Sequence, residues 1–323
     1  MPLIPLLERR LIVVTGKGGT GKTTVAAALA LAAATRGKRV LVAEVGLDEH
    51  LPALLDPKAP LVGYRGRSLR PGLVAMRIDP YEALTEYLGL QIGLAGLVRR
   101  VLDNRAFRQL MDASPGWREL ITLGKVWHLE QQRDARDAIR FDLIVIDAPA
   151  TGHGLTFLDV PRVVGSAVRT GPLRRHAGWV EEMIRDPRRT LLLPVTLAEE
   201  LPARETAELV ARLRGDIGVT VDRVVVNAVA PDPFPAAVPD LDARLARLPA
   251  ALPLPGTPPP AVLAACAAHL RGRHLLNERW SKEIAETTRL PLVSLPRLRD
   301  GARGAVALAA LGDALAVDPV EAT

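Results

Sequence analysis

Two lysines and four glycines are concentrated in one nine-residue segment near the amino terminus, although the chain has only six lysines among its 42 basic residues. The segment reads Gly16-Lys17-Gly18-Gly19-Thr20-Gly21-Lys22-Thr23-Thr24. Its spacing, G-x-x-x-x-G-K-[ST], lets backbone N–H groups surround phosphate oxygens. We expect Lys22 to contact the β- and γ-phosphates and Thr23 to hold Mg²⁺. All nine residues are predicted to form a site for ATP and Mg²⁺.

A second candidate for the metal site is Asp147, which ends the apolar segment FDLIVID. A carboxylate that directly follows a buried strand matches the Walker B position, where it orients the hydration shell of the metal. Thr23 and Asp147 are therefore the predicted metal-site residues, and Lys22 and Asp147 are predicted to act in catalysis.

Lys17 stands directly after the first glycine of the loop. A second lysine at this place resembles the deviant Walker A loop of the group that includes MinD, ParA, the nitrogenase iron protein and ArsA. In that group the lysine reaches the nucleotide of the partner subunit. The resemblance implies a homodimer in which Lys17 stabilises transition-state charge, and cations supplied in this way are worth roughly 10³ to 10⁵ in rate. The alternative is an ordinary solvated lysine.

The residues after Asp147 resemble one family within that group. The segment Asp147 to His153, DAPATGH, is similar to the switch II sequence D-T-A-P-T-G-H of the ArsA family. That family includes the arsenite-pump ATPase and the guided-entry ATPase that targets tail-anchored membrane proteins. We interpret His153 as a structural hydrogen-bonding residue rather than a catalyst.

The resemblance extends over most of the chain and adds two candidate base-binding residues. Its other segments are 72–88, the S-P-G turn at 114–116, 194–206 and 221–227. Asn227 matches the family's adenine-contacting asparagine, whose amide offers a donor and an acceptor to the base. Pro296 stands where the family closes the base pocket.

Switch I departs from the family pattern. Where the family has an aspartate that positions the attacking water, this chain has Gly46. Glu44 and Asp48 are the neighbouring carboxylates, Glu44 at the end of a strand and Asp48 on the following loop. We predict slow hydrolysis of ATP that depends on one of them. The alternative, which Gly46 motivates, is a nucleotide-binding module that has lost hydrolysis.

Cys266 is the single cysteine of the chain, so no intramolecular disulfide can form. The metalloid site of the family and the zinc site of its targeting branch each need several cysteines, and neither a metalloid nor a zinc site is expected here. We expect Cys266 to be a small buried hydrophobic residue.

The remaining pattern predicts an α/β fold, namely a P-loop NTPase with a doubly wound, mostly parallel sheet flanked by helices. Residues 1–323 are read as one domain, with a helical insert at about 81–133, a second helical segment at about 160–185 and a proline-rich surface loop over 231–260. The expected strands are apolar runs over 11–15, 39–45, 72–78, 141–146, 190–195, 223–226 and 292–295.

Composition excludes some classes of protein and leaves others open. No apolar run approaches the roughly 20 residues of a membrane-spanning helix, and the amino terminus does not resemble a secretory signal, so the cytoplasm is expected. The net charge of +6 comes mostly from scattered arginines and gives no strong reason to expect nucleic acid. We expect a protein client or a membrane partner to bind the surface that the two helical segments form, and most of the apolar residues in these segments to pack within the domain. A MinD- or ParA-like protein that binds DNA or an anionic membrane is the alternative.

Overall fold

The computed structural model of the protein describes residues 4–92, 116–149, 158–165, 170–234 and 258–317, with a few single residues between these ranges. Some of the sequence predictions fall outside these residues. They concern the end of switch II at 150–153, including His153, the insert over 93–115 and most of the proline-rich loop.

The core of the molecule is an eight-stranded sheet with the order β3-β4-β2-β5-β1-β6-β7-β8. Apart from the edge strand β3, its strands are predominantly apolar, which is typical of a parallel sheet covered on both faces. The strands are β1 (Leu11–Thr15), β2 (Val40–Val45), β3 (Arg67–Arg70), β4 (Leu73–Ile78), β5 (Leu143–Asp147), β6 (Thr190–Leu197), β7 (Val224–Val229) and β8 (Leu292–Pro296). All neighbours pair in parallel except β3, which is antiparallel to β4. The predicted fold class is confirmed.

The edge strand β3 was missed by the sequence analysis. Its sequence, RSLR, is short, charged and largely exposed, so it lacks the apolar signal that identified the other seven strands. Charged, short strands are common at the edges of sheets, where they discourage pairing with other chains.

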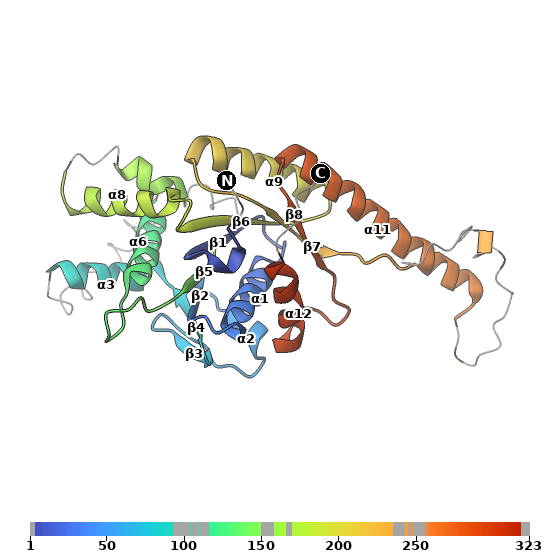
Figure 1. Cartoon of the computed structure of the whole chain (residues 1–323), viewed down its shortest axis with the longest axis horizontal. Helices are drawn as coiled ribbons and strands as arrows, with labels where there is room; N and C mark the ends of the chain where they lie inside the picture. The colour runs from blue at the N-terminus through green and yellow to red at the C-terminus, as the bar shows by residue number, and fades with distance from the viewer. Residues whose placement is uncertain are drawn as a thin grey trace.

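Helices cover both faces of the sheet (Figure 1). One face carries α1 (Lys22–Thr35), α2 (Leu51–Leu55) and α12 (Gly304–Ala316). Helix α12 packs tightly on α1 because Gly312 has no side chain, and a Cβ there would lie 2.7 Å from the carbonyl oxygen of Ala28. The other face carries α6 (Trp117–Gln131), α8 (Pro172–Arg185) and α9 (Glu200–Arg212). Short turns of 3₁₀ and π-helix occupy Leu6–Glu8 and Leu213–Ile217.

Both predicted helical segments contain helices among their described residues. The insert includes α3 (Pro80–Ile92) and α6, which pack against each other, and α8 packs in turn on α6. Residues 158–165 are also helical. Together α3, α6 and α8 form a helical layer beside the β4 and β2 side of the sheet, as Figure 1 shows.

Helix α11 (Pro260–Thr288) was not predicted, and its first half extends away from the body of the molecule (Figure 1). Its second half is held by Asn277, whose Oδ1 accepts the N–H of Ala230 at 2.8 Å and whose Nδ2 donates to the carbonyl of Ala198 at 2.9 Å. Cys266 lies on the extended half and is exposed, so the prediction of a buried cysteine was wrong. Within the described ranges, no helix is long and apolar enough to cross a membrane.

Candidate nucleotide site

The predicted site residues converge at one edge of the sheet because parallel strands end on the same side. Strand β5 lies between β2 and β1, so Asp147 is level with Val14 in one neighbour and with Glu44 in the other. The chain leaves β1 for β2 on one side of the sheet and returns to β6 on the other. Ligands of open α/β sheets bind at such a switch point, outside the carboxyl ends of the strands.

The P-loop connects β1 to α1, and two of its glycines are required by close contacts. A Cβ at Gly16 would lie 2.2 Å from the carbonyl oxygen of Val195, and one at Gly21 would lie 2.2 Å from Nδ2 of Asn227. Both glycines also have φ in the positive range, 142° and 89° respectively. The loop is closed internally by the Thr20 hydroxyl, which donates to the carbonyl of Lys17 at 2.9 Å. The backbone path through these residues therefore depends on glycine.

The inner surface of this loop suits a phosphate group. The N–H groups of residues 18–21 donate no hydrogen bond to any residue that the structure describes, and no side chain caps the start of α1. Unpaired N–H groups at a helix start carry partial positive charge and attract anions. Lys22 adds a full charge: its Nζ donates to the carbonyl of Lys17 at 3.0 Å, and burial lowers its pKa while the nearby Asp147 raises it.

Thr23 and Asp147 form a pair that fits a divalent cation. The Thr23 hydroxyl donates to Oδ2 of Asp147 at 2.6 Å, while Oδ1 of Asp147 is buried with no hydrogen-bond partner among the described residues. The pKa of Asp147 is raised to about 6, because burial and the charge of Glu44 raise it by more than the Thr23 hydrogen bond and Lys22 lower it. A buried carboxylate with an unsatisfied oxygen beside a threonine hydroxyl offers the hard oxygen ligands that Mg²⁺ prefers.

Lys17 does not point into its own P-loop. Its Nζ forms an ion pair with Oε1 of Glu205 on α9 of the same chain, and Oε2 of Glu205 is buried without a partner within the described residues. Sequence reasoning missed Glu205, because the two residues are 188 positions apart and only the fold brings them together. The role of Lys17 at a dimer interface stays a prediction.

Asn227 ends up against the P-loop, since its Nδ2 donates to the carbonyl of Thr20 at 2.9 Å. This bond supports the loop, a role that the sequence did not indicate. Pro296 is exposed at the end of β8, the strand next to β7. Both residues lie on the nucleotide edge of the sheet, and their contacts with adenine stay predictions.

The two candidate water-positioning carboxylates differ in their surroundings. Glu44 is buried, and its Oε2 accepts the N–H groups of His50 at 2.8 Å and Leu51 at 3.0 Å, so that it caps the start of α2. Asp48 is exposed on the loop between β2 and α2. Gly46 has φ of 149°, which favours glycine, although no atom lies within 4 Å of where its Cβ would be. The altered switch I therefore holds Glu44 in place and leaves Asp48 on the surface.

Comparison with known proteins agrees with this geometry. The sequence model of the ArsA family, described as anion-transporting ATPase, matches residues 9–176, which is more than half of the 323-residue chain. ATPase BagA of Mycobacterium tuberculosis is 35% identical over 229 residues, 69% of this chain and 66% of that protein.

Arsenical pump-driving ATPases are more distant relatives. The protein from Acidiphilium multivorum is 29% identical over 238 residues, 68% of this chain and 39% of that protein. An Escherichia coli protein of the same name is 28% identical over 237 residues and is also matched over 39% of its length. The chain thus spans slightly less than two thirds of the mycobacterial relative and well under half of the arsenical pump-driving proteins. With a P-loop, a paired Thr23 and Asp147 and this match over most of the sheet, the chain belongs to the ArsA family of ATPases.

Proposed function

We propose that this chain binds MgATP, hydrolyses it slowly, and works in the cytoplasm as a homodimer whose closure depends on the nucleotide. The observation that carries the proposal is the Thr23–Asp147 hydrogen bond of 2.6 Å, because it leaves Oδ1 of Asp147 buried and without a described partner beside the P-loop. That oxygen can bind a metal ion, and the unpaired N–H groups of the loop can bind a polyphosphate.

Each residue of the site has a definite task in this scheme. The N–H groups of residues 18–21 and the Lys22 ammonium bind the phosphates, while Thr23 and Asp147 hold Mg²⁺. When bound, the metal offsets negative charge on the phosphate oxygens. Asn227 and Pro296 form the walls of the space for the adenine base. Nucleotide binding then requires Asp147 to be ionised, which its neighbours Lys22 and Thr23 favour.

Dimer closure gives Lys17 its role. In the single chain Lys17 is engaged by Glu205, and its side chain is 45% exposed, so it is accessible to a partner subunit. In the closed dimer it reaches the phosphates bound by the other chain and stabilises charge that develops during hydrolysis. Asp48, on an exposed loop, is placed to enter the site only when the dimer closes, as switch segments do in other nucleotide hydrolases.

A second candidate is a nucleotide-binding module that does not hydrolyse. The hydrogen bonds of Glu44 favour it, because a carboxylate oxygen that accepts two backbone N–H groups is held at the start of α2 rather than at an attacking water. The two candidates make different predictions. In the module, ATP is bound tightly and is recovered unchanged; in the hydrolase, phosphate is released slowly.

For the partner, we propose a protein client bound on the helical layer of α3, α6 and α8. Trp179 on α8 is 41% exposed and stacks on Trp127 of α6, with ring centroids 5.0 Å apart. Aromatic side chains at a surface are enriched where proteins bind. The membrane-binding alternative is less favoured, because the three leucines of the last described helix, α12, are buried in the core that α12 forms with α1; they are Leu308, Leu311 and Leu315.

Parallel measurements of turnover and assembly test the proposal. In sedimentation, the parent chain is expected to dimerise with ATP and Mg²⁺ but not with ADP, and to release phosphate in the same conditions. The Lys22→Ala variant should lose nucleotide affinity, whereas Lys58→Ala, which changes an exposed lysine outside the site, should match the parent. Unchanged nucleotide affinity in Lys22→Ala contradicts the site assignment, and a monomer under every condition contradicts the switch.

A further inference from the structure

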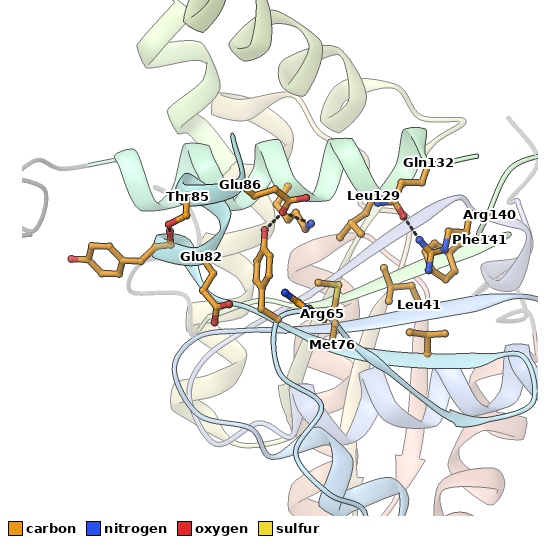
Figure 2. Close-up of a pocket in the computed structure, with 15 residues that line it drawn as sticks. Leu41, Arg65, Met76, Glu82, Thr85, Glu86, Leu129, Gln132, Arg140 and Phe141 are labelled. Carbon is orange, nitrogen blue, oxygen red and sulfur yellow. Dashed lines mark hydrogen bonds and ion pairs between the residues drawn. The ribbon is translucent and has the colours of Figure 1, made fainter. Parts of the chain in front are cut away.

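A cavity of about 580 Å³ lies between the sheet and the helical layer, away from the nucleotide edge (Figure 2). Leu41 and Met76 line it from β2 and β4, and Glu86 and Leu129 line it from α3 and α6. Leu41 precedes Glu44 by three residues, which places it roughly 10 Å farther from the carboxyl end of the strand. The volume falls within the roughly 300 to 1,000 Å³ of small-molecule sites. Neither the nucleotide site nor the proposed dimer contact uses this space.

One part of the cavity wall is apolar. It consists of Leu41, Val74, Met76, Leu129 and Phe141. Apart from the half-buried Val74, these side chains are buried, between 1% and 6% exposed, and belong to the core beneath the helical layer. This surface suits the hydrocarbon part of a ligand, because apolar contact area gains roughly 25 cal/mol for each Å² removed from water.

Both carboxylates that line the cavity have a cationic partner. Lys125 donates to Oε2 of Glu86 at 2.6 Å, and the Tyr64 hydroxyl donates to the same oxygen. Burial opposes the ionisation of Glu86, yet the hydrogen bonds from Lys125 and Tyr64 lower its pKa, so it is an anion paired with a cation. Glu82 is paired with Arg77, with a nitrogen-to-oxygen distance of 3.4 Å. Glu86 therefore leaves no net negative charge in the cavity, whereas the half-exposed Glu82 shares Arg77 with Glu49.

Two exposed arginines at the cavity supply positive charge without a counter-ion among the described residues. Arg65 makes no hydrogen bond or ion pair with any residue in the described ranges, and Figure 2 shows it beside Met76. Arg140 donates to Oε1 of Gln132 at 3.0 Å and lies 5.2 Å from the centre of the Phe141 ring, but it has no carboxylate partner among the described residues. The cavity thus combines an apolar wall with two uncompensated guanidinium groups.

We propose that this cavity binds an amphipathic carboxylic acid, with its hydrocarbon part on the apolar wall and its carboxylate at Arg65 or Arg140. A guanidinium group matches a carboxylate with two parallel hydrogen bonds, which makes arginine the suitable residue for this head group. The ligand would contact both the sheet and the helical layer, because β2 and β4 form one side of the cavity and α3 and α6 the other.

Calorimetric titration of the full chain with decanoate tests the proposal, with decanol as the neutral probe of equal chain length. We expect one decanoate per chain, with or without ADP, and decanol bound at least roughly ten-fold more weakly, because a hydrogen bond to a charged group is worth about 10- to 100-fold in affinity. Arg65→Ala or Arg140→Ala should reduce decanoate affinity by a similar factor. Arg67→Ala is the matched control, since Arg67 is an exposed arginine on β3 that does not line the cavity.

A cavity-filling variant provides a second measurement. Val74→Phe places a ring in the cavity from β4 and should abolish decanoate binding, while ATP binding shows that the variant is folded. The proposal is overturned if decanol binds as tightly as decanoate, if both Arg65→Ala and Arg140→Ala bind decanoate like the parent, or if no saturable binding of decanoate is found. Each of these results leaves the nucleotide site untouched.

Discussion

Lys17 of the P-loop forms an ion pair with Glu205 on α9 of its own chain, and the second carboxylate oxygen of Glu205 is buried without a described partner. The lysine that the family directs toward a partner subunit is therefore held within the subunit. Assembly of the proposed dimer has to compete with this ion pair, so the pair opposes closure until ATP provides a stronger attraction.

The first prediction concerns the release of Lys17. The neutral variant Glu205→Gln removes the competing charge and should lower the ATP concentration needed for dimerisation. The pair is partly exposed, and such pairs contribute about 0.2 to 1 kcal/mol, which corresponds to a shift of up to roughly five-fold. Sedimentation across an ATP titration measures this shift. Glu200→Gln is the control, because Glu200 lies on the same helix and pairs with Arg204 instead. Weaker dimerisation in Glu205→Gln would mean that Glu205 serves the closed state.

The second prediction concerns the contribution of Lys17 across the dimer. Lys17→Ala should bind nucleotide with nearly parental affinity but should lose turnover by roughly 10³-fold or more, as trans cations of this kind do. ATP-induced dimerisation should be lost as well. Dimers that contain one Lys17→Ala chain and one Lys22→Ala chain give a sharper measurement. One of their two sites should be active, because it keeps its own Lys22 and receives Lys17 from the other chain. Full activity of Lys17→Ala alone contradicts a role in catalysis.

The third prediction concerns the stability of the nucleotide-free protein as a function of pH. Burial raises the pKa of Asp147 to about 6, whereas aspartate in an unfolded chain ionises near 3.9. Between these values the folded state holds a proton that the unfolded state has lost, so the free energy of unfolding falls as the pH rises through this window. Asp147→Asn removes the titration while its amide oxygen still accepts the Thr23 hydrogen bond. The free energy of unfolding of Asp147→Asn should exceed that of the parent only slightly near pH 4. Above pH 6.5 the difference should reach about 1 to 3 kcal/mol.

Urea unfolding in the presence of a chelator measures this difference. Asp142→Asn is a control of opposite sign, because the hydrogen bond from Arg39 lowers the pKa of Asp142. The stability that Asp142 contributes is present at neutral pH and is lost as the pH falls. The Asp142→Asn variant should therefore be less stable than the parent at pH 7 and equally stable in acid. A pH-independent advantage of Asp147→Asn would show that Asp147 is not held protonated by the fold.

The fourth prediction separates Glu44 from Asp48. Gln at position 44 keeps an oxygen for the N–H groups of His50 and Leu51, so Glu44→Gln should fold and bind ATP. If Glu44 positions the attacking water, Glu44→Gln loses roughly 100- to 1,000-fold in turnover; if Asp48 does so, the loss appears in Asp48→Asn. Glu49→Gln is the control, since Glu49 instead accepts the N–H groups of Val62 and Gly63. Parental turnover in both variants rules out both carboxylates.

The part of the site that could be predicted from the sequence is the part encoded by neighbouring residues. The P-loop carries its glycines and lysines within nine residues, and Asp147 follows an apolar strand, so motif and strand together predict their meeting. The same continuous apolar runs predicted seven strands of the sheet. Strand β3 has no such run, and its position depends on pairing with β4.

The remaining features arise from tertiary structure. Glu205 becomes relevant only because α9 packs beside β6, which brings it to Lys17 from 188 residues away. The hydrogen bonds of Glu44 to the start of α2 depend on how the loop after β2 turns back. Cys266 has two alanines on each side, a composition typical of a buried helix. This part of α11 is nevertheless largely exposed, and Cys266 is exposed with it.

The projecting half of α11 has a practical consequence for measuring movement. Cys266 stands 11 residues before the Asn277 anchor, roughly 16 Å along the helix axis at 1.5 Å for each residue. A tilt of about 10° around that anchor would move Cys266 by roughly 3 Å over this lever arm. Because the chain has a single cysteine, a spin label attached there needs no background mutations. Two labels in a dimer would form one reporter pair, and their separation would record, in the unmodified sequence, how far the two lever arms rotate in each nucleotide state.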